Sequence, residues 1–127
     1  MEILPYQNKD YEGVLTLLKE ENWLVFFDTH KEEYKKALAQ SITYVAKENE
    51  RIIGFIRAIS DGVYLTFIGE LIVQKEFRKN HIGSSLIAHL ESQVPCKKLE
   101  LISDADAFYS KNHFAIVGTG QRKQVLK

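Results

Sequence analysis

The sequence has little cysteine, proline or histidine, and these shortages exclude several kinds of site. One cysteine, Cys96, among 127 residues excludes an internal disulfide and any zinc site built from several cysteines. The histidines do not recur at the spacing of a ligand pair on one helix, so no metal site is expected; they are His30, His81, His89 and His113. No apolar run approaches the roughly 20 residues of a membrane span. The N-terminus also lacks the basic start and long apolar stretch of a signal peptide.

An excess of one charge is missing as well. The 17 Lys and Arg residues balance the 17 Asp and Glu residues, whereas a dedicated nucleic-acid binder needs a basic surplus. Hydrophobic residues at 45% and charged residues at 27% are ordinary globular proportions, which argues against a disordered tail or a fibre. We therefore expect residues 1–127 to form one soluble, cytoplasmic domain that binds neither nucleic acid nor membrane.

Apolar periodicity predicts a mixed α/β domain with the element order β-α-α-β-β-β-α-β-α-β and a weak final strand. Helices are expected from Asn8 or Asp10 to about Leu18, and over Thr29–Gln40, Ile82–Val94 and Asp104–Lys111. Strands are expected near residues 3–6 and over Ile42–Ala46, Arg51–Ile59, Val63–Val73, Leu99–Ile102, Phe114–Val117 and, weakly, Gln121–Leu126. Asp61-Gly62 predicts a hairpin turn, and Gly69 predicts a bulge within the long strand that follows.

The segment from Glu70 to Leu86 carries the clearest chemical signal. A long strand ends in a polar loop that leads into a helix whose first turn holds Gly83 and two serines. Unpaired N–H groups at a helix start attract anions, a glycine lets an anion approach, and Arg78 and Lys79 add charge. This pattern predicts a phosphate or pyrophosphate site. The alternative is a plain strand-to-helix connection with solvated basic residues.

This segment resembles the pyrophosphate loop of the GNAT superfamily of acyl-CoA-dependent N-acetyltransferases. The family loop reads Gln or Arg, two residues, Gly, one residue, then Gly or Ala. Arg78 and Gly83 match it, while His81 stands in place of the first glycine; histidine tolerates a positive φ better than most residues.

A second resemblance lies downstream, in Phe108-Tyr109 followed by Phe114. His113 stands where the family usually has a glycine, and Asn112 is expected to form the helix-ending turn instead. The element order agrees from the first strand to about Phe114. The resemblance implies a GNAT-like fold, with a mostly antiparallel central sheet flanked by about four helices.

The same resemblance implies acetyl-CoA as cosubstrate and no metal. Main-chain atoms of Leu71, Ile72 and Val73 would pair with the pantetheine arm. The pyrophosphate would lie over the loop and helix start formed by Arg78, Lys79, Asn80, His81, Ile82, Gly83 and Ser84.

Two catalytic roles follow from the resemblance. Glu70 lies where many family members place the carboxylate base, and Tyr109 matches the usual acid that gives a proton to the CoA sulfur. The alternatives are an outward-facing strand glutamate and an ordinary half-buried helix tyrosine.

The acceptor would bind near an aromatic region that contains Trp23, Phe26, Phe27 and His30. An aromatic wall suits an apolar amine or stacks against a cation. The alternative is a core plug that closes the sheet. Asp104 and Asp106 are expected to cap the helix that holds Tyr109, and the alternative is that they contribute to an acidic pocket for a polyamine.

The sequence thus predicts direct acetyl transfer from acetyl-CoA to a primary amine of a small molecule or peptide, by a monomer or homodimer. One alternative is a non-catalytic acyl-CoA-binding or protein-interaction module on the same fold. Another is a phosphate-ligand binding domain unrelated to CoA.

Overall fold

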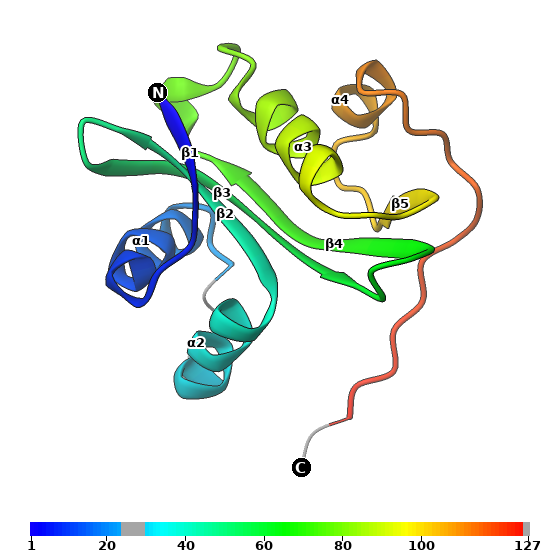
Figure 1. Cartoon of the computed structure of the whole chain (residues 1–127), viewed down its shortest axis with the longest axis horizontal. Helices are drawn as coiled ribbons and strands as arrows, with labels where there is room; N and C mark the ends of the chain where they lie inside the picture. Colours follow the sequence, from blue (N-terminus) through cyan, green and yellow to red (C-terminus); the bar gives the residue numbers. More distant parts are fainter. Residues whose placement is uncertain (24–29, 126–127) are drawn as a thin grey trace.

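The computed structural model describes residues 1–23 and 30–125, which fold around one five-stranded sheet (Figure 1). The strands lie in chain order: β1 (Glu2–Pro5), β2 (Ile42–Glu48), β3 (Arg51–Ser60), β4 (Leu65–Val73) and β5 (Lys98–Leu101). The first four strands are antiparallel, and β5 runs parallel to β4 because a crossover helix joins them.

Helices cover both faces of the sheet. They are α1 (Tyr11–Glu20), α2 (Lys31–Gln40), α3 (Ile82–Gln93) and α4 (Asp106–Lys111), with single 3-10 turns η1 at Asn8–Asp10 and η4 at Lys75–Phe77. Figure 1 shows α1 and α2 on one face and α3 and α4 on the other. None of the helices in the described ranges is long and apolar enough to cross a membrane.

Alternating side chains of the central strands give the domain two apolar clusters. Val45 and Phe55 pack with α1 and α2, while Ala46 and Ile56 pack with α3, and all four are fully buried. This alternation is the period-two pattern of a strand covered on both faces. The sheet therefore lies between two layers of helices, and each of its faces packs against one layer.

The bulge predicted at Gly69 is confirmed. Arg57 lies opposite Glu70 and the next residue, Ala58, lies opposite Ile68, so Gly69 is left without a partner on β3. A Cβ at this position would lie 2.8 Å from Nη2 of Arg57, so a larger residue would require the guanidinium that binds Glu70 to shift. The bulge changes the direction of β4 at its centre.

Beyond the bulge, β4 separates from β5. The two strands pair only between Leu65–Ile68 and Lys98–Leu101. From Gly69 to Val73 the edge of β4 that faces β5 has no strand partner within the described residues. Main-chain groups at Leu71 and Val73 are therefore left beside an open split in the sheet.

Two sequence predictions about the C-terminal region were wrong. Phe114–Val117 does not form a strand, and neither does any of residues 121–125. The chain after α4 is extended but hydrogen-bonds to no neighbouring strand in the described structure. A strong β propensity forms a strand only where a sheet edge pairs with it.

Candidate active site

A small cavity lies at the split between β4 and β5. Its volume is 130 Å³, and its walls come from β4, the end of β5, the loop before α4, and α4 itself. The lining residues are Trp23, Ile68, Gly69, Glu70, Leu71, Leu101, Ile102, Ser103, Asp104 and Tyr109. The fold thus brings the predicted residues Glu70, Leu71, Trp23 and Tyr109 together at one place.

A larger cavity of 390 Å³ lies between α1 and the β2–β3 hairpin. It contains none of the predicted site residues, and a buried ion pair between Lys47 and Asp10, at 3.0 Å, forms part of its wall. The smaller cavity is lined by Glu70 and Tyr109, the two residues with predicted catalytic roles, so it is the candidate site.

Tyr109 is the candidate proton donor in this cavity. The side chain is 9% exposed and is fixed by edge-to-face contacts with Phe108 and Phe114, at centroid distances of 5.0 and 5.5 Å. Burial, with a smaller contribution from the charge of Asp104, raises the pKa of Tyr109 to about 12. The phenol is therefore protonated at neutral pH and able to donate.

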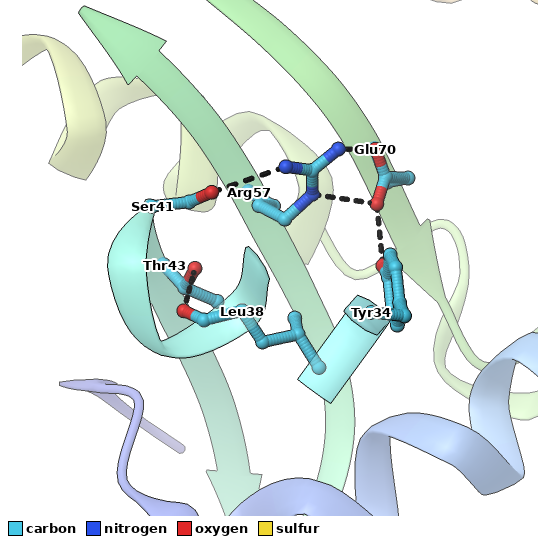
Figure 2. Close-up of polar contacts among 6 residues, drawn as sticks. All are labelled: Tyr34, Leu38, Ser41, Thr43, Arg57 and Glu70. Atoms are coloured by element: carbon cyan, nitrogen blue, oxygen red, sulfur yellow. Dashed lines mark hydrogen bonds and ion pairs between the residues drawn. The ribbon is translucent and has the colours of Figure 1, made fainter. Parts of the chain in front are cut away.

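Glu70 lies in a buried polar network rather than on an outward face. Only 8% of the residue is exposed, so the outward-facing alternative does not describe it. Nε and Nη2 of Arg57 donate to its two carboxylate oxygens at 2.8 and 2.7 Å, and the hydroxyl of Tyr34 donates to the same carboxylate (Figure 2). Both oxygens are thus occupied by donors from β3 and α2.

Arg57 and Tyr34 both donate hydrogen bonds to the Glu70 carboxylate, and this changes the pKa of each. Burial lowers the pKa of Arg57, but the hydrogen bonds and charge of Glu70 outweigh it and raise the pKa above its ordinary value. Burial and the adjacent Glu70 raise the pKa of Tyr34 as well. Nη1 of Arg57 also donates to the hydroxyl of Ser41 at 3.0 Å, so the network fixes α2 against the sheet (Figure 2).

The loop before α3 has the backbone shape of an anion cradle. Lys79 and His81 both adopt left-handed conformations, with φ of 71° and 62°, and α3 begins directly after His81. His81 therefore takes up the positive φ that a glycine would adopt at this place in the loop. No side chain caps the helix, so the N–H groups of its first turn have no protein acceptor among the described residues.

Arg78 does not extend freely toward this cradle. Its Nε donates to the carbonyl oxygen of Val73 at 2.9 Å, and its Nη2 forms an ion pair with Glu21, beyond the end of α1. The side chain thus joins the loop to β4 and to the α1 end. Lys75 and Lys79 supply further positive charge on the same loop.

Gly83 has a packing role that the sequence pattern did not reveal. It is buried, and a Cβ there would lie 2.9 Å from Cζ of Phe108, so α3 approaches α4 closely at this point. This glycine in the first turn of α3 therefore permits the close contact between α3 and α4, the helix that carries Tyr109.

Replacing Gly83 with alanine is expected to lower the free energy of unfolding by about 1–3 kcal/mol, because the added methyl group overpacks this contact. Denaturant unfolding measures the change. Gly118→Ala is the matched control, since a Cβ there meets nothing within 4 Å. Combining Gly83→Ala with Phe108→Leu should recover part of the loss; equal losses at Gly83 and Gly118 would contradict this account.

Of the four residues predicted to lie near the acceptor, only Trp23 is seen to line the cavity within the described residues. Trp23 lines the cavity and also packs against the cluster under α1 and α2. His30 is exposed and precedes α2, whereas Phe26 and Phe27 lie outside the described residues.

The predicted capping of α4 was wrong. Ala105 is the N-cap of α4, with no side-chain cap, and Asp104 lines the cavity instead. The predicted turn after α4 is present, with Asn112 as the C-cap, but the left-handed residue in it is His113 (φ 71°) and not Asn112.

Sequence reasoning missed three residues of this region: Arg57, Tyr34 and Glu21. A signal existed for Arg57, because a charged residue in the middle of the apolar strand Ile53–Ile59 has to find a partner. No comparable signal marked Tyr34 or Glu21, since Tyr34 belongs to a helix with an ordinary amphipathic pattern and Glu21 is a charged residue just after the end of α1.

Comparisons with known proteins agree with this geometry. The family model described as an acetyltransferase (GNAT) domain matches residues 39–116, which is more than half of the chain. No curated protein sequence matches the chain.

Solved structures with the same fold extend over nearly the whole chain. A GNAT-family acetyltransferase from Streptococcus pneumoniae is 24% identical, with 99% of this chain and 98% of that chain covered and a TM-score of 0.81. An aminoglycoside 6'-acetyltransferase type Ii is 26% identical over 93% of this chain and 85% of its own, with a TM-score of 0.76. The PaiA N-acetyltransferase from Thermoplasma acidophilum, solved with coenzyme A, is 18% identical over 94% and 92%, with a TM-score of 0.77. The separation of β4 from β5, the left-handed loop before α3 and the family match over residues 39–116 have one common explanation. The chain belongs to the GNAT acetyltransferase family.

Proposed function

We propose that the chain is an N-acetyltransferase that moves the acetyl group of acetyl-CoA directly onto a primary amine of a small molecule or peptide. The observation that carries the proposal is the split between β4 and β5, with the Tyr109 phenol in the wall of the cavity that the split forms. A thioester supplies an activated acyl group with a thiolate leaving group.

The described residues fit this donor. The free edge of β4 at Leu71 to Val73 offers main-chain groups to an extended amide-bearing chain. The uncapped first turn of α3 and the left-handed Lys79 and His81 offer N–H groups to phosphate oxygens. The 130 Å³ cavity has room for a short acyl group beside β4.

Within this proposal, Tyr109 gives its proton to the departing sulfur. Burial keeps the phenol protonated, and the two aromatic contacts hold its ring in one orientation. The rest of the acceleration comes from holding the two reactants side by side.

Glu70 has a positioning role in the same proposal, in place of the base role expected from the sequence. Its two oxygens accept from Arg57 and Tyr34, so the carboxylate fixes the bulge of β4 at the cavity wall. The incoming amine then loses its proton to solvent. Trp23 and Asp104, an aromatic and an acidic wall residue, are the acceptor contacts that we propose.

The test measures free thiol released from acetyl-CoA across a panel of primary amines, beside the thermal stability of the protein with CoA. Stabilisation by CoA with turnover on an amine is expected. Stabilisation without turnover on any acceptor would favour a non-catalytic acyl-CoA-binding module. If CoA does not stabilise the protein and no amine is acetylated, the proposal is overturned.

The alkaline side of the rate profile gives a separate prediction. With a pKa of about 12, Tyr109 remains protonated up to roughly pH 11, whereas the amine becomes more reactive as it loses its proton. The value of kcat should therefore rise with pH and show no fall below about pH 10. A fall with an apparent pKa under 10 that disappears in Tyr109→Phe would contradict the raised pKa.

A further inference from the structure

The 390 Å³ cavity between α1 and the β2–β3 hairpin has no part in the proposed reaction. It shares no lining residue with the candidate active site, and Figure 1 shows α1 on the other side of the sheet from α3 and α4. Leu17 and Ile52 give it an apolar wall, and most of its other lining side chains are charged or polar. The cavity therefore has the mixed lining of a site for a small polar ligand.

A buried amide in the wall of this cavity lacks a hydrogen-bond partner. Gln74 follows β4 and is only 8% exposed, and its Oε1 accepts no hydrogen bond within the described residues. Its Nε2 donates to the carboxylate of Glu20, which lines the same cavity, at 3.4 and 3.5 Å. The amide thus points toward a lining residue, with its oxygen left for a further donor. A buried oxygen without a donor is costly, so we expect the donor to come from outside the chain.

The charges around the cavity leave carboxylates in excess. Lys47 pairs with Asp10 at 3.0 Å, and Arg51 pairs with Glu76 at 3.1 Å. The lining charges that form no ion pair in the described part of the chain are Lys9, Glu20 and Glu50. These three side chains belong to exposed residues, so a ligand can reach the cavity from solvent. Two carboxylates against one ammonium favour a ligand with positive charge.

We propose that this cavity binds a small organic cation, a primary ammonium on a short apolar stem. An ammonium has three N–H donors and no acceptor, which suits Oε1 of Gln74 and the carboxylate of Glu20. Hydrogen bonds between charged groups are the stronger kind, so the Glu20 contact supplies much of the affinity. The apolar stem lies against Leu17 and Ile52.

The two residues that would hold the ammonium adjoin the contacts of Arg78. Gln74 follows Val73, whose carbonyl oxygen accepts from Nε of Arg78, and Glu20 precedes Glu21, which forms the ion pair with Arg78. A cation held by Gln74 and Glu20 therefore stabilises both attachments of the loop before α3. The bound cation should thus increase the affinity for CoA. This link rests on the proposed function, whereas the binding of the cation does not.

Thermal unfolding with n-butylammonium chloride tests the binding. The Tm of the full chain should rise with the concentration of n-butylammonium, as for any ligand that binds only the folded state. Sodium butyrate, which has an anionic group on a similar stem, and sodium chloride at the same ionic strength should give no such rise. An equal rise with either salt, or no rise with n-butylammonium, would overturn the proposal.

Replacing Gln74 with leucine removes the unpartnered oxygen and keeps a side chain of similar size. Calorimetry should show n-butylammonium binding weakened by about tenfold or more. The Tm without ligand should stay the same or rise, because a buried polar group without a partner is removed. Glu20→Gln, at an exposed position, should weaken binding to a similar degree.

Glu12→Gln is the matched control, because Glu12 is an exposed acid on the same helix and does not line the cavity. It should leave the affinity for n-butylammonium unchanged. Parent affinity in both Gln74→Leu and Glu20→Gln, or an equal loss in Glu12→Gln, would overturn the proposal.

A primary amine also suits the acceptor role at the candidate active site, so Asp104→Asn separates the two cavities. The stabilisation by n-butylammonium should persist in Asp104→Asn, because Asp104 lines only the smaller cavity, and should be lost in Gln74→Leu. The reverse result would place the cation at the candidate active site and overturn the proposal.

The link to CoA has its own measurement. Saturating n-butylammonium should raise the affinity for CoA several-fold in the parent chain, and CoA should raise the affinity for n-butylammonium by the same factor. Gln74→Leu should abolish both effects. CoA binding that n-butylammonium does not change would overturn the link, whereas absence of CoA binding under every condition would contradict the proposed function instead.

Discussion

Replacing Arg57 with alanine is expected to lower the free energy of unfolding by about 3–5 kcal/mol, because it leaves a buried carboxylate without its main partner. The side chains of Arg57 and Glu70 are only 16% and 9% exposed, and two hydrogen bonds at 2.7 and 2.8 Å join them. Tyr34 alone cannot balance the remaining charge. Thermal or denaturant unfolding measures the loss, which should exceed about 10 °C in Tm.

A second arginine of β3 provides the control. Arg51 forms an ion pair with Glu76 at 3.1 Å, but both side chains are more than half exposed, at 53% and 65%. Water screens that pair, so Arg51→Ala should cost about 1 kcal/mol or less.

A variant that changes both buried partners, Arg57→Met with Glu70→Met, should recover much of the stability lost in Arg57→Ala, because no unpaired charge remains. Equal losses for Arg57→Ala and Arg51→Ala would show that the buried network contributes no more than a surface pair.

Replacing Tyr109 with phenylalanine is expected to lower kcat by about 10²–10⁴-fold, the usual contribution of a positioned proton donor. The change removes only the hydroxyl group. The edge-to-face contacts with Phe108 and Phe114 remain, so the protein should keep its stability and its affinity for CoA. Steady-state kinetics with acetyl-CoA and the best amine of the panel give kcat, and calorimetry with CoA gives the affinity.

Tyr64→Phe is the matched control, because Tyr64 is 56% exposed in the turn before β4 and does not line the cavity. It should leave kcat unchanged. A Tyr109→Phe variant with the parent rate would remove the phenol from the mechanism, whereas a loss of CoA affinity would show that the residue supports binding instead.

Most elements of the fold were predictable because their patterns are local. The helical spacing of Leu86 and Leu90, the alternation along β3, and the bulge at Gly69 each depend on residues close together in the chain. Phe114–Val117 has an equally strong local pattern and still forms no strand. A strand needs a partner edge, and that condition is not local.

The candidate site was predictable where the family motif fixes the backbone and unpredictable where side chains meet across elements. The left-handed conformation at His81 and the location of Tyr109 at the cavity agree with motif spacing. The partners of Glu70 come from 13 and 36 residues away, on β3 and α2, so no spacing rule reveals them.

The sequence by itself determined the family, the layered sheet and the loop that precedes α3, because hydrophobic period and turn residues act over a few positions. Only the tertiary structure decided what surrounds each functional side chain. It placed Gly83 against Phe108, engaged Glu70 with Arg57, and left the apolar tail without a sheet edge of its own. These outcomes depend on packing between distant segments, where burial and charge partners are set by the whole fold.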